Sequence, residues 1–174
     1  QVVDKDGNGF VDIPGNNQGD FLLVETCGER CGGFTLSLNW DDWKDGAVDV
    51  DAWLLGQGSN GQPYTAGEAT TRRTGAASPA MEFLSFPRGL PAGSYALVMR
   101  TAQPASGKRL HVYAQGGARL AQRVPEGSLG VPATADKALS VGALDAVSQR
   151  VAEYSGRGTT DDNRLKPDIS APAG

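Results

Sequence analysis

Several stretches of the chain alternate apolar and polar side chains residue by residue. Between residues 33 and 40, every even-numbered side chain is large and apolar: Phe34, Leu36, Leu38 and Trp40. The same alternation recurs in residues 47–55, 93–101 and 109–115, and shorter apolar runs occupy residues 20–26 and 80–86. Alternate side chains of a strand point to opposite faces, so each run predicts a strand with one buried face. About six such strands, separated by Gly, Pro, Asn and Ser, predict a mainly β fold, an antiparallel β-sandwich of jelly-roll type.

The composition agrees with many short strands. The 174 residues include 24 Gly and 10 Pro, which favour tight turns over long helices. A chain of this length can hold one ordinary domain, or a small domain and a fragment. Residues 56–79 are polar and small, and they predict a mobile loop over one end of the sandwich. Arg72 and Arg73 in that loop are either a contact for an anion or partner, or solvated side chains.

The charge distribution is uneven. Residues 1–60 hold 11 acidic and 3 basic residues, whereas residues 61–174 hold 9 and 13. Cations are therefore expected near the N-terminal third. No run of Lys and Arg interleaved with aromatic residues is present, which argues against a nucleic-acid partner. No apolar stretch reaches the ~18 residues of a membrane helix, and the N-terminus lacks a basic-then-apolar signal sequence.

The two cysteines, Cys27 and Cys31, lie in "TCGERCGG" between two apolar runs. A disulfide across the tip of a hairpin is sterically plausible there, and it implies an oxidising, secreted setting. The alternative is a pair of free thiols. A metal site is poorly supported, because no further Cys or His lies nearby.

The N-terminal stretch "DKDGNGFVD" resembles part of a calcium-binding loop. Its candidate ligands are the side chains of Asp4, Asp6, Asn8 and Asp12 and the backbone carbonyl of Phe10. Ca²⁺ takes six to eight oxygen ligands, and this spacing wraps oxygens around one point, with Gly9 at the sharp turn. However, Gly15 stands where a bidentate Glu is expected, and no flanking helices are apparent. Both a calcium loop and a plain Asp/Asn/Gly turn remain open.

A second acidic group and three tryptophans allow further interpretations. The acidic group consists of Asp41, Asp42, Asp45, Asp49 and Asp51. It is either another calcium site or the solvated polar face of adjacent strands, and strand alternation already explains Asp49 and Asp51. Trp40 belongs with the apolar face of its strand. Trp43 and Trp53 are either buried or part of an aromatic platform for sugars or peptides.

Beyond Gly116 the clean alternation stops, and the remaining third of the chain resembles the subtilisin-like serine proteases, or subtilases. Three pieces carry the resemblance: "PATADKALSVGALD", "SQRVAEYSGRGTT" and "LKPDISAPAG". They are similar, in this order, to the stretch bordering the family's primary specificity pocket, its Ser-Ser-Arg-Gly-Pro loop and its Lys-Pro-Asp-Ile-x-Ala-Pro-Gly run. Gly156 and Thr159 depart from the loop pattern, and Ala173 is inserted before the final Gly. "ALSVGALD" predicts a short buried strand.

The resemblance implies where a substrate would bind. The implied pocket residues are Val131, Pro132, Ala133 and Thr134, followed by Gly142, Ala143, Leu144 and Asp145. No stretch matches the family's catalytic Asp motif, its His-Gly-Thr motif or its Gly-Thr-Ser motif. The only histidine, His111, lies in an alternating run and is expected to be a strand residue. The chain is therefore expected to be inactive alone, a piece of a longer protease that ends before the nucleophile.

Together these observations predict three segments: a calcium-loop-like segment at residues 1–19, a β-sandwich insertion at 20–115 and, by the resemblance, a short partial α/β segment of a subtilase catalytic domain at 116–174. The expected parent is a secreted subtilisin-like serine endopeptidase that acts on proteins or peptides. Within it, the sandwich would affect substrate access or stability. The alternative is a stand-alone, calcium-stabilised sandwich that binds carbohydrate or protein. The oligomeric state stays open.

Overall fold

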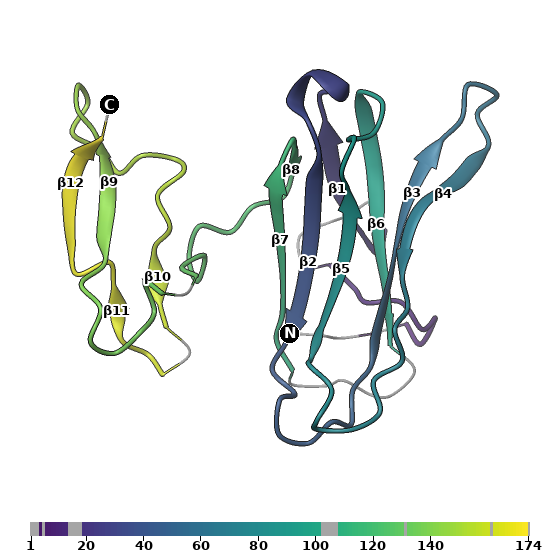
Figure 1. Ribbon diagram of the computed structural model, residues 1–174, viewed down its shortest axis with the longest axis horizontal. Helices are drawn as coiled ribbons and strands as arrows, with labels where there is room; N and C mark the ends of the chain where they lie inside the picture. The colour runs from purple at the N-terminus through teal and green to yellow at the C-terminus, as the bar shows by residue number, and fades with distance from the viewer. Residues whose placement is uncertain are drawn as a thin grey trace. The chain divides into compact units, whose positions relative to one another are not determined.

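The computed structural model describes residues 4, 6–13, 19–101, 108–130, 132–160 and 162–173. They belong to two compact units, Gln1–Gln122 and Arg123–Gly174, which are considered separately (Figure 1). The described part of the chain has no α-helix, and hence no helix with the length and apolar character of a membrane span.

In the first unit, the part of the chain that the structure describes forms two antiparallel sheets. The five-stranded sheet has the order β4-β3-β6-β1-β8. Its strands are β1 (Phe21–Thr26), β3 (Val50–Gln57), β4 (Pro63–Ala69), β6 (Gly93–Thr101) and β8 (Ala118–Leu120). The three-stranded sheet has the order β5-β2-β7, with β2 (Phe34–Trp40), β5 (Met81–Phe86) and β7 (Leu110–Gly116). The mainly β, antiparallel fold predicted from the alternation is therefore confirmed, whereas its jelly-roll character stays a prediction.

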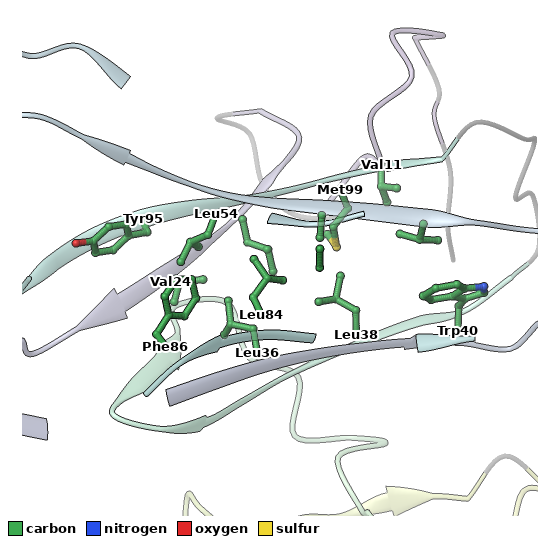
Figure 2. Packing of buried hydrophobic residues seen from close by; sticks show 14 of the residues in the cluster. Val11, Val24, Leu36, Leu38, Trp40, Leu54, Leu84, Phe86, Tyr95 and Met99 are labelled. Carbon is green, nitrogen blue, oxygen red and sulfur yellow. The ribbon is translucent and has the colours of Figure 1, made fainter. Parts of the chain in front are cut away.

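The core lies between these two sheets, as Figure 2 shows. In β2 every second side chain is buried, and in β3 Val50, Ala52 and Leu54 follow the same pattern. Trp40 is 1% exposed, and its indole N–H donates to the Val48 carbonyl at 3.1 Å. Trp40 is therefore a core residue, as its position in the alternation predicts. Its hydrogen bond satisfies the one polar atom that this side chain brings into the core.

The prediction of one long loop at residues 56–79 is wrong, because this segment contains β4. β4 pairs with β3 antiparallel from Ala52↔Ala69 to Gln57↔Pro63, with an irregularity between Leu54 and Leu55. Its sequence, "PYTAGEA", has little apolar alternation, so a pattern based on a buried face does not detect it. It is an edge strand held mainly by backbone pairing, and edge strands have less need of apolar side chains.

Asp42 and Arg73 form a buried ion pair, so the solvated alternative is wrong for both residues, and neither interpretation offered for them from the sequence included this pairing. Arg73 Nη1 lies 2.5 Å from Asp42 Oδ2, and their side chains are 2% and 0% exposed. Arg73 Nη2 also donates to the Asp42 carbonyl at 2.6 Å, and the Val48 N–H donates to Asp42 Oδ2 at 2.8 Å. Lys108 Nζ lies 3.0 Å from Asp42 Oδ1. One carboxylate thus joins the loop before β3, the loop before β5 and the residues before β7.

The link between β1 and β2 is not the hairpin expected around the cysteines, since these strands belong to different sheets. A short 3-10 helix, η1 (Glu29–Cys31), lies in this link. Cys27 and Cys31 are joined by a disulfide, with their Cα atoms 5.9 Å apart. The disulfide therefore closes the turn that carries the chain from one sheet to the other.

In the second unit, the described residues form two small sheets. β9 (Val141–Asp145) and β12 (Ile169–Ala173) run parallel, whereas β10 (Gly158–Thr159) and β11 (Leu165–Lys166) form an antiparallel hairpin. The compact units divide after Gln122, a few residues beyond the predicted segment boundary at 115/116. The reason is that β8 pairs with β1 in the sandwich.

Candidate functional site

Gly142–Asp145, four of the implied pocket residues, lie in β9. The register with β12 runs from Val141 opposite Ile169 to Asp145 opposite Ala173. A side chain at Gly142 would meet Pro167 Cγ at 2.7 Å from its Cβ, so the backbone approaches the Lys166–Pro167 segment closely. This contact explains why a glycine stands at this position of the strand.

The other edge of β9 is held by residues 151–155. The Ala143 N–H donates to Ser155 Oγ at 3.0 Å, and the Ala152 N–H donates to the Ala143 carbonyl at 3.0 Å. Leu144 forms an isolated antiparallel bridge with Val151. The strand "VGALD" is therefore bonded on both edges, by β12 and by the chain that follows it.

Asp145 closes the turn after β9. Its Oδ1 accepts hydrogen bonds from the N–H groups of Val147 at 3.2 Å and Ser148 at 2.6 Å, in the manner of an Asx turn. The hydrogen bonds from Ser148, chiefly from its backbone N–H, lower the pKa of Asp145 below its ordinary value. Asp145 therefore shapes a turn, and its carboxylate is already engaged.

The other implied pocket residues that the structure describes lie in consecutive turns before β9. Val131 lies outside the described residues, whereas Pro132, Ala133 and Thr134 are described. The Ala135 N–H donates to the Pro132 carbonyl at 2.9 Å, and the Ala138 N–H donates to the Ala135 carbonyl at 3.2 Å. Residues 132–138, the pocket segment, therefore adopt a turn-rich path without strand pairing.

Two cationic side chains around β11 bind carbonyls of the pocket segment. Arg164 Nη2 donates to the Thr134 carbonyl at 2.8 Å, and Lys166 Nζ donates to the Ala138 carbonyl at 2.7 Å. The pocket residues implied by the resemblance include neither Arg164 nor Lys166. A signal was nevertheless present in the sequence, since Asp162, Arg164, Lys166 and Asp168 alternate at a period of two.

Each of these cations also pairs with an aspartate. Arg164 Nε donates to Asp162 Oδ2 at 2.8 Å, and Lys166 Nζ donates to Asp168 Oδ2 at 2.7 Å. The hydrogen bond from Lys166, helped by the Ser140 N–H, lowers the pKa of Asp168 to about 2. The bond from Arg164, followed by one from Thr160, lowers the pKa of Asp162 to about 2. Both aspartates are therefore charged at neutral pH.

The candidate calcium ligands lie at the start of the sandwich unit. Asp4 accepts hydrogen bonds from the N–H groups of Asn8 at 3.1 Å and Gly9 at 2.8 Å, and Gly9 has a φ of +88°. Asn8 Nδ2 donates to Asp6 Oδ2 at 2.9 Å and to Asp20 Oδ2 at 2.8 Å. The side-chain amide of Asn8 therefore lies between two carboxylates.

The rest of this N-terminal stretch is anchored to the sandwich. Phe10 forms an antiparallel bridge with Arg100, and the buried Val11 donates its N–H to the Met99 carbonyl at 2.9 Å. Asp12 follows directly. Within the described ranges, no three His, Cys, Asp or Glu side chains come together closely enough to hold a metal ion. Calcium binding by Asp4, Asp6, Asn8, Phe10 and Asp12 stays a prediction.

The remaining aromatic candidates lie on the surface of the sandwich. His111 lies in β7 opposite Asn39, and its ring is nearly parallel to that of Tyr113 with centroids 6.3 Å apart. Trp43 is 51% exposed in the loop after β2, whereas Trp53 is partly exposed in β3. These two tryptophans lie on different elements, so one shared platform of both rings stays a prediction.

The model of the subtilase family matches residues 61–174, from just before β4 to the last residue. The chain therefore belongs to the subtilase family, as the motifs after Gly116 predict.

A solved structure with a similar fold is that of the Clostridium perfringens CspB protease. It is 19% identical in sequence and has a TM-score of 0.53. The similarity covers 87% of this chain and 36% of that chain. The chain thus spans just over a third of the length of this protease. At this level of identity, the comparison establishes a shared fold.

Proposed function

We propose that the chain is part of a secreted subtilisin-like serine endopeptidase, in which it supplies a β-sandwich and a substrate-binding edge. The observation that carries the proposal is the family match across residues 61–174, which includes all the described strands of the second unit. The turn fixed by Asp145 and the carbonyl contacts of Arg164 and Lys166 give this edge a defined shape. The disulfide between Cys27 and Cys31 supports an oxidising, extracellular setting.

The reacting groups of the proposed protease lie outside this chain. Peptide hydrolysis by this class needs a serine, a histidine that accepts its proton and a carboxylate that orients the histidine. The only histidine here, His111, lies on a strand of the sandwich. The role assigned to residues 132–145 is therefore substrate binding, and bond cleavage is assigned to the rest of the parent protein.

The full-length gene product tests this function directly. It should cleave casein, and a fluorophosphonate that modifies activated serines should abolish the cleavage. The 174-residue chain, treated in parallel, should show no cleavage above buffer. Cleavage that is insensitive to the reagent, or inhibitor-sensitive cleavage by the 174-residue chain alone, would contradict the proposal.

The sandwich itself is proposed to stabilise the parent through its outer face. Two rows of apolar side chains cross the five-stranded sheet: Trp53, Val98 and Phe21 in one, and Leu55, Ala96 and Leu23 in the next. All six are partly exposed, and they alternate with buried neighbours such as Leu54 and Leu97. Contiguous apolar surface of this kind is typical of an interface. The proposed occupant is the remaining catalytic domain of the same polypeptide.

Replacing Trp53 with glutamine should therefore destabilise the full-length protein more than the 174-residue chain. We expect a loss of about 2 kcal/mol in the full-length protein, the size of an interface hot spot, because the indole would lose a buried contact. In the 174-residue chain the loss should stay within about 0.5 kcal/mol. Urea denaturation of both forms measures the difference. The control is Phe83→Gln on the other sheet, where the ring is 54% exposed. Equal losses for Trp53→Gln in the two forms would contradict this role.

A further inference from the structure

The pocket segment and Ser140, which follows it, are held by three side chains of one short stretch. Arg164 binds the Thr134 carbonyl, Lys166 binds the Ala138 carbonyl, and Asp168 accepts hydrogen bonds from the N–H and hydroxyl of Ser140 at 2.7 and 3.0 Å. The three residues are spaced two apart, so one face of an extended stretch meets the pocket segment at two points and Ser140 at a third.

The stretch that supplies these side chains is itself well ordered by hydrogen bonds. At the tip of the β10–β11 hairpin, the Thr160 N–H donates to the Arg164 carbonyl at 2.9 Å, and the Arg164 N–H donates to Thr160 Oγ1 at 3.0 Å. Thr160 is buried, and its hydroxyl also bonds Asp162. Asp162 in turn holds the Arg164 guanidinium. The guanidinium is thus oriented on one side by Asp162 before it reaches Thr134.

The pocket segment, in contrast, has few bonds of its own. Its internal hydrogen bonds are those of two turns, Ala135 to Pro132 and Ala138 to Ala135. Pro132, Asp136 and Lys137 are exposed. Since turns of this kind open easily when they lack packing, the path of the segment depends on the bonds to Arg164 and Lys166.

We propose that Arg164 and Lys166 are positioning residues for substrate recognition. They fix the backbone of residues 134–138, so that the wall of the specificity pocket keeps one shape. The proposal rests on the proposed protease function, which assigns the segment to the pocket. Of the two, Arg164 has the side chain that is harder to replace, because its planar guanidinium binds Asp162 and Thr134 simultaneously through different nitrogens. A lysine at position 164 has one ammonium group and cannot reproduce this fork.

The first test is amide hydrogen exchange in the full-length gene product. In Arg164→Gln, exchange at the Ala135 and Ala138 N–H groups should rise about tenfold, since a charge-assisted hydrogen bond to the segment is lost. Arg164→Lys should give an intermediate rise. The control is Arg150→Gln, which removes an exposed arginine of the same unit and should leave exchange at these amides unchanged. Unchanged exchange in Arg164→Gln would overturn the inference, whatever the activity of the protein.

The second test is kinetic and uses the same variants on peptide substrates that differ at the residue before the cleaved bond. Arg164→Gln should raise KM roughly threefold to tenfold and reduce discrimination between the peptides, with a smaller change in kcat, because binding geometry is disturbed more than the reacting groups. An equal fall in kcat for all peptides at constant KM would overturn the positioning role. Absence of any protease activity in the parent would instead overturn the proposed function. The exchange result would then decide whether Arg164 fixes the backbone of residues 134–138.

Discussion

Replacing Asp42 with alanine should lower the free energy of unfolding of the sandwich by about 3–5 kcal/mol, the cost of breaking a buried ion pair by removing one partner. Asp42 is 1% exposed and Arg73 is 8% exposed. Without the carboxylate, the Arg73 guanidinium would stay buried with its charge uncompensated. The Val48 N–H would also lose its acceptor. Because Lys108 binds the same carboxylate, three connections of the sandwich would loosen together.

Lowering the pH should act on the same group in the wild-type chain. Burial alone raises the pKa of Asp42, but hydrogen bonds from the Val48 N–H, Lys108 and Arg73 outweigh it and lower the pKa from 3.8 to about 2. A carboxyl with a depressed folded-state pKa contributes stability that is fully present above its unfolded pKa. This stability should therefore be lost as the pH falls from above 3.8 towards 2. Asp42→Asn should remove this part of the acid sensitivity.

Urea denaturation followed by tryptophan fluorescence measures both effects, since Trp40, Trp43 and Trp53 all lie in the sandwich. The matched control is Asp45→Ala. Asp45 also pairs with Lys108, at 3.3 Å, but its side chain is 69% exposed. Removing an exposed ion pair should cost less than about 1 kcal/mol. Similar losses for Asp42→Ala and Asp45→Ala would show that burial of the Asp42–Arg73 pair does not carry the predicted energy.

The strands of the sandwich could be predicted where one face is buried, because burial of one face requires apolar side chains at alternate positions. β2 and β6 alternate so regularly that their positions follow from Phe34–Trp40 and Gly93–Thr101 alone. β4 was missed because an edge strand needs a backbone partner more than an apolar face. The Asp42–Arg73 pair was missed for a related reason. The two residues are 31 positions apart, and the sequence around either one does not indicate that the other will neutralise its charge.

In the second unit, too, some features could be predicted from the sequence and others could not. The motifs located β9, and the resemblance assigned its residues to a pocket, but motif matching gave no reason for Arg164. Its importance comes from contacts with Asp162, two residues away, and Thr134, 30 residues away. Motif matching gives no reason for Gly158 either. The space around a glycine depends on chain segments that are distant in sequence.

Replacing Gly158 with alanine should destabilise the second unit by about 3 kcal/mol or more, from backbone strain and steric overlap together. Gly158 has a φ of +124°, a conformation that side chains other than glycine rarely adopt. An added Cβ would lie 2.2 Å from the Gly127 nitrogen. That nitrogen donates to the Arg157 carbonyl at 2.8 Å, next to the parallel bridge between Glu126 and Arg157. The substitution would force these two backbones apart.

Hydrogen exchange of the intact chain can detect this change without a tryptophan in the unit. The Gly127 and Ser128 N–H groups, which both donate to the Arg157 carbonyl, should lose most of their protection in Gly158→Ala. The control is Gly130→Ala in the same unit, where an added Cβ meets no atom within 4 Å. Sandwich amides should keep their protection in both variants, because Gly158 belongs to the other compact unit. Equal protection at Gly127 in the two variants would mean that the backbones of residues 127 and 158 are not in close contact. The need for a glycine at position 158 would then have a cause other than the close approach of the Gly127 backbone.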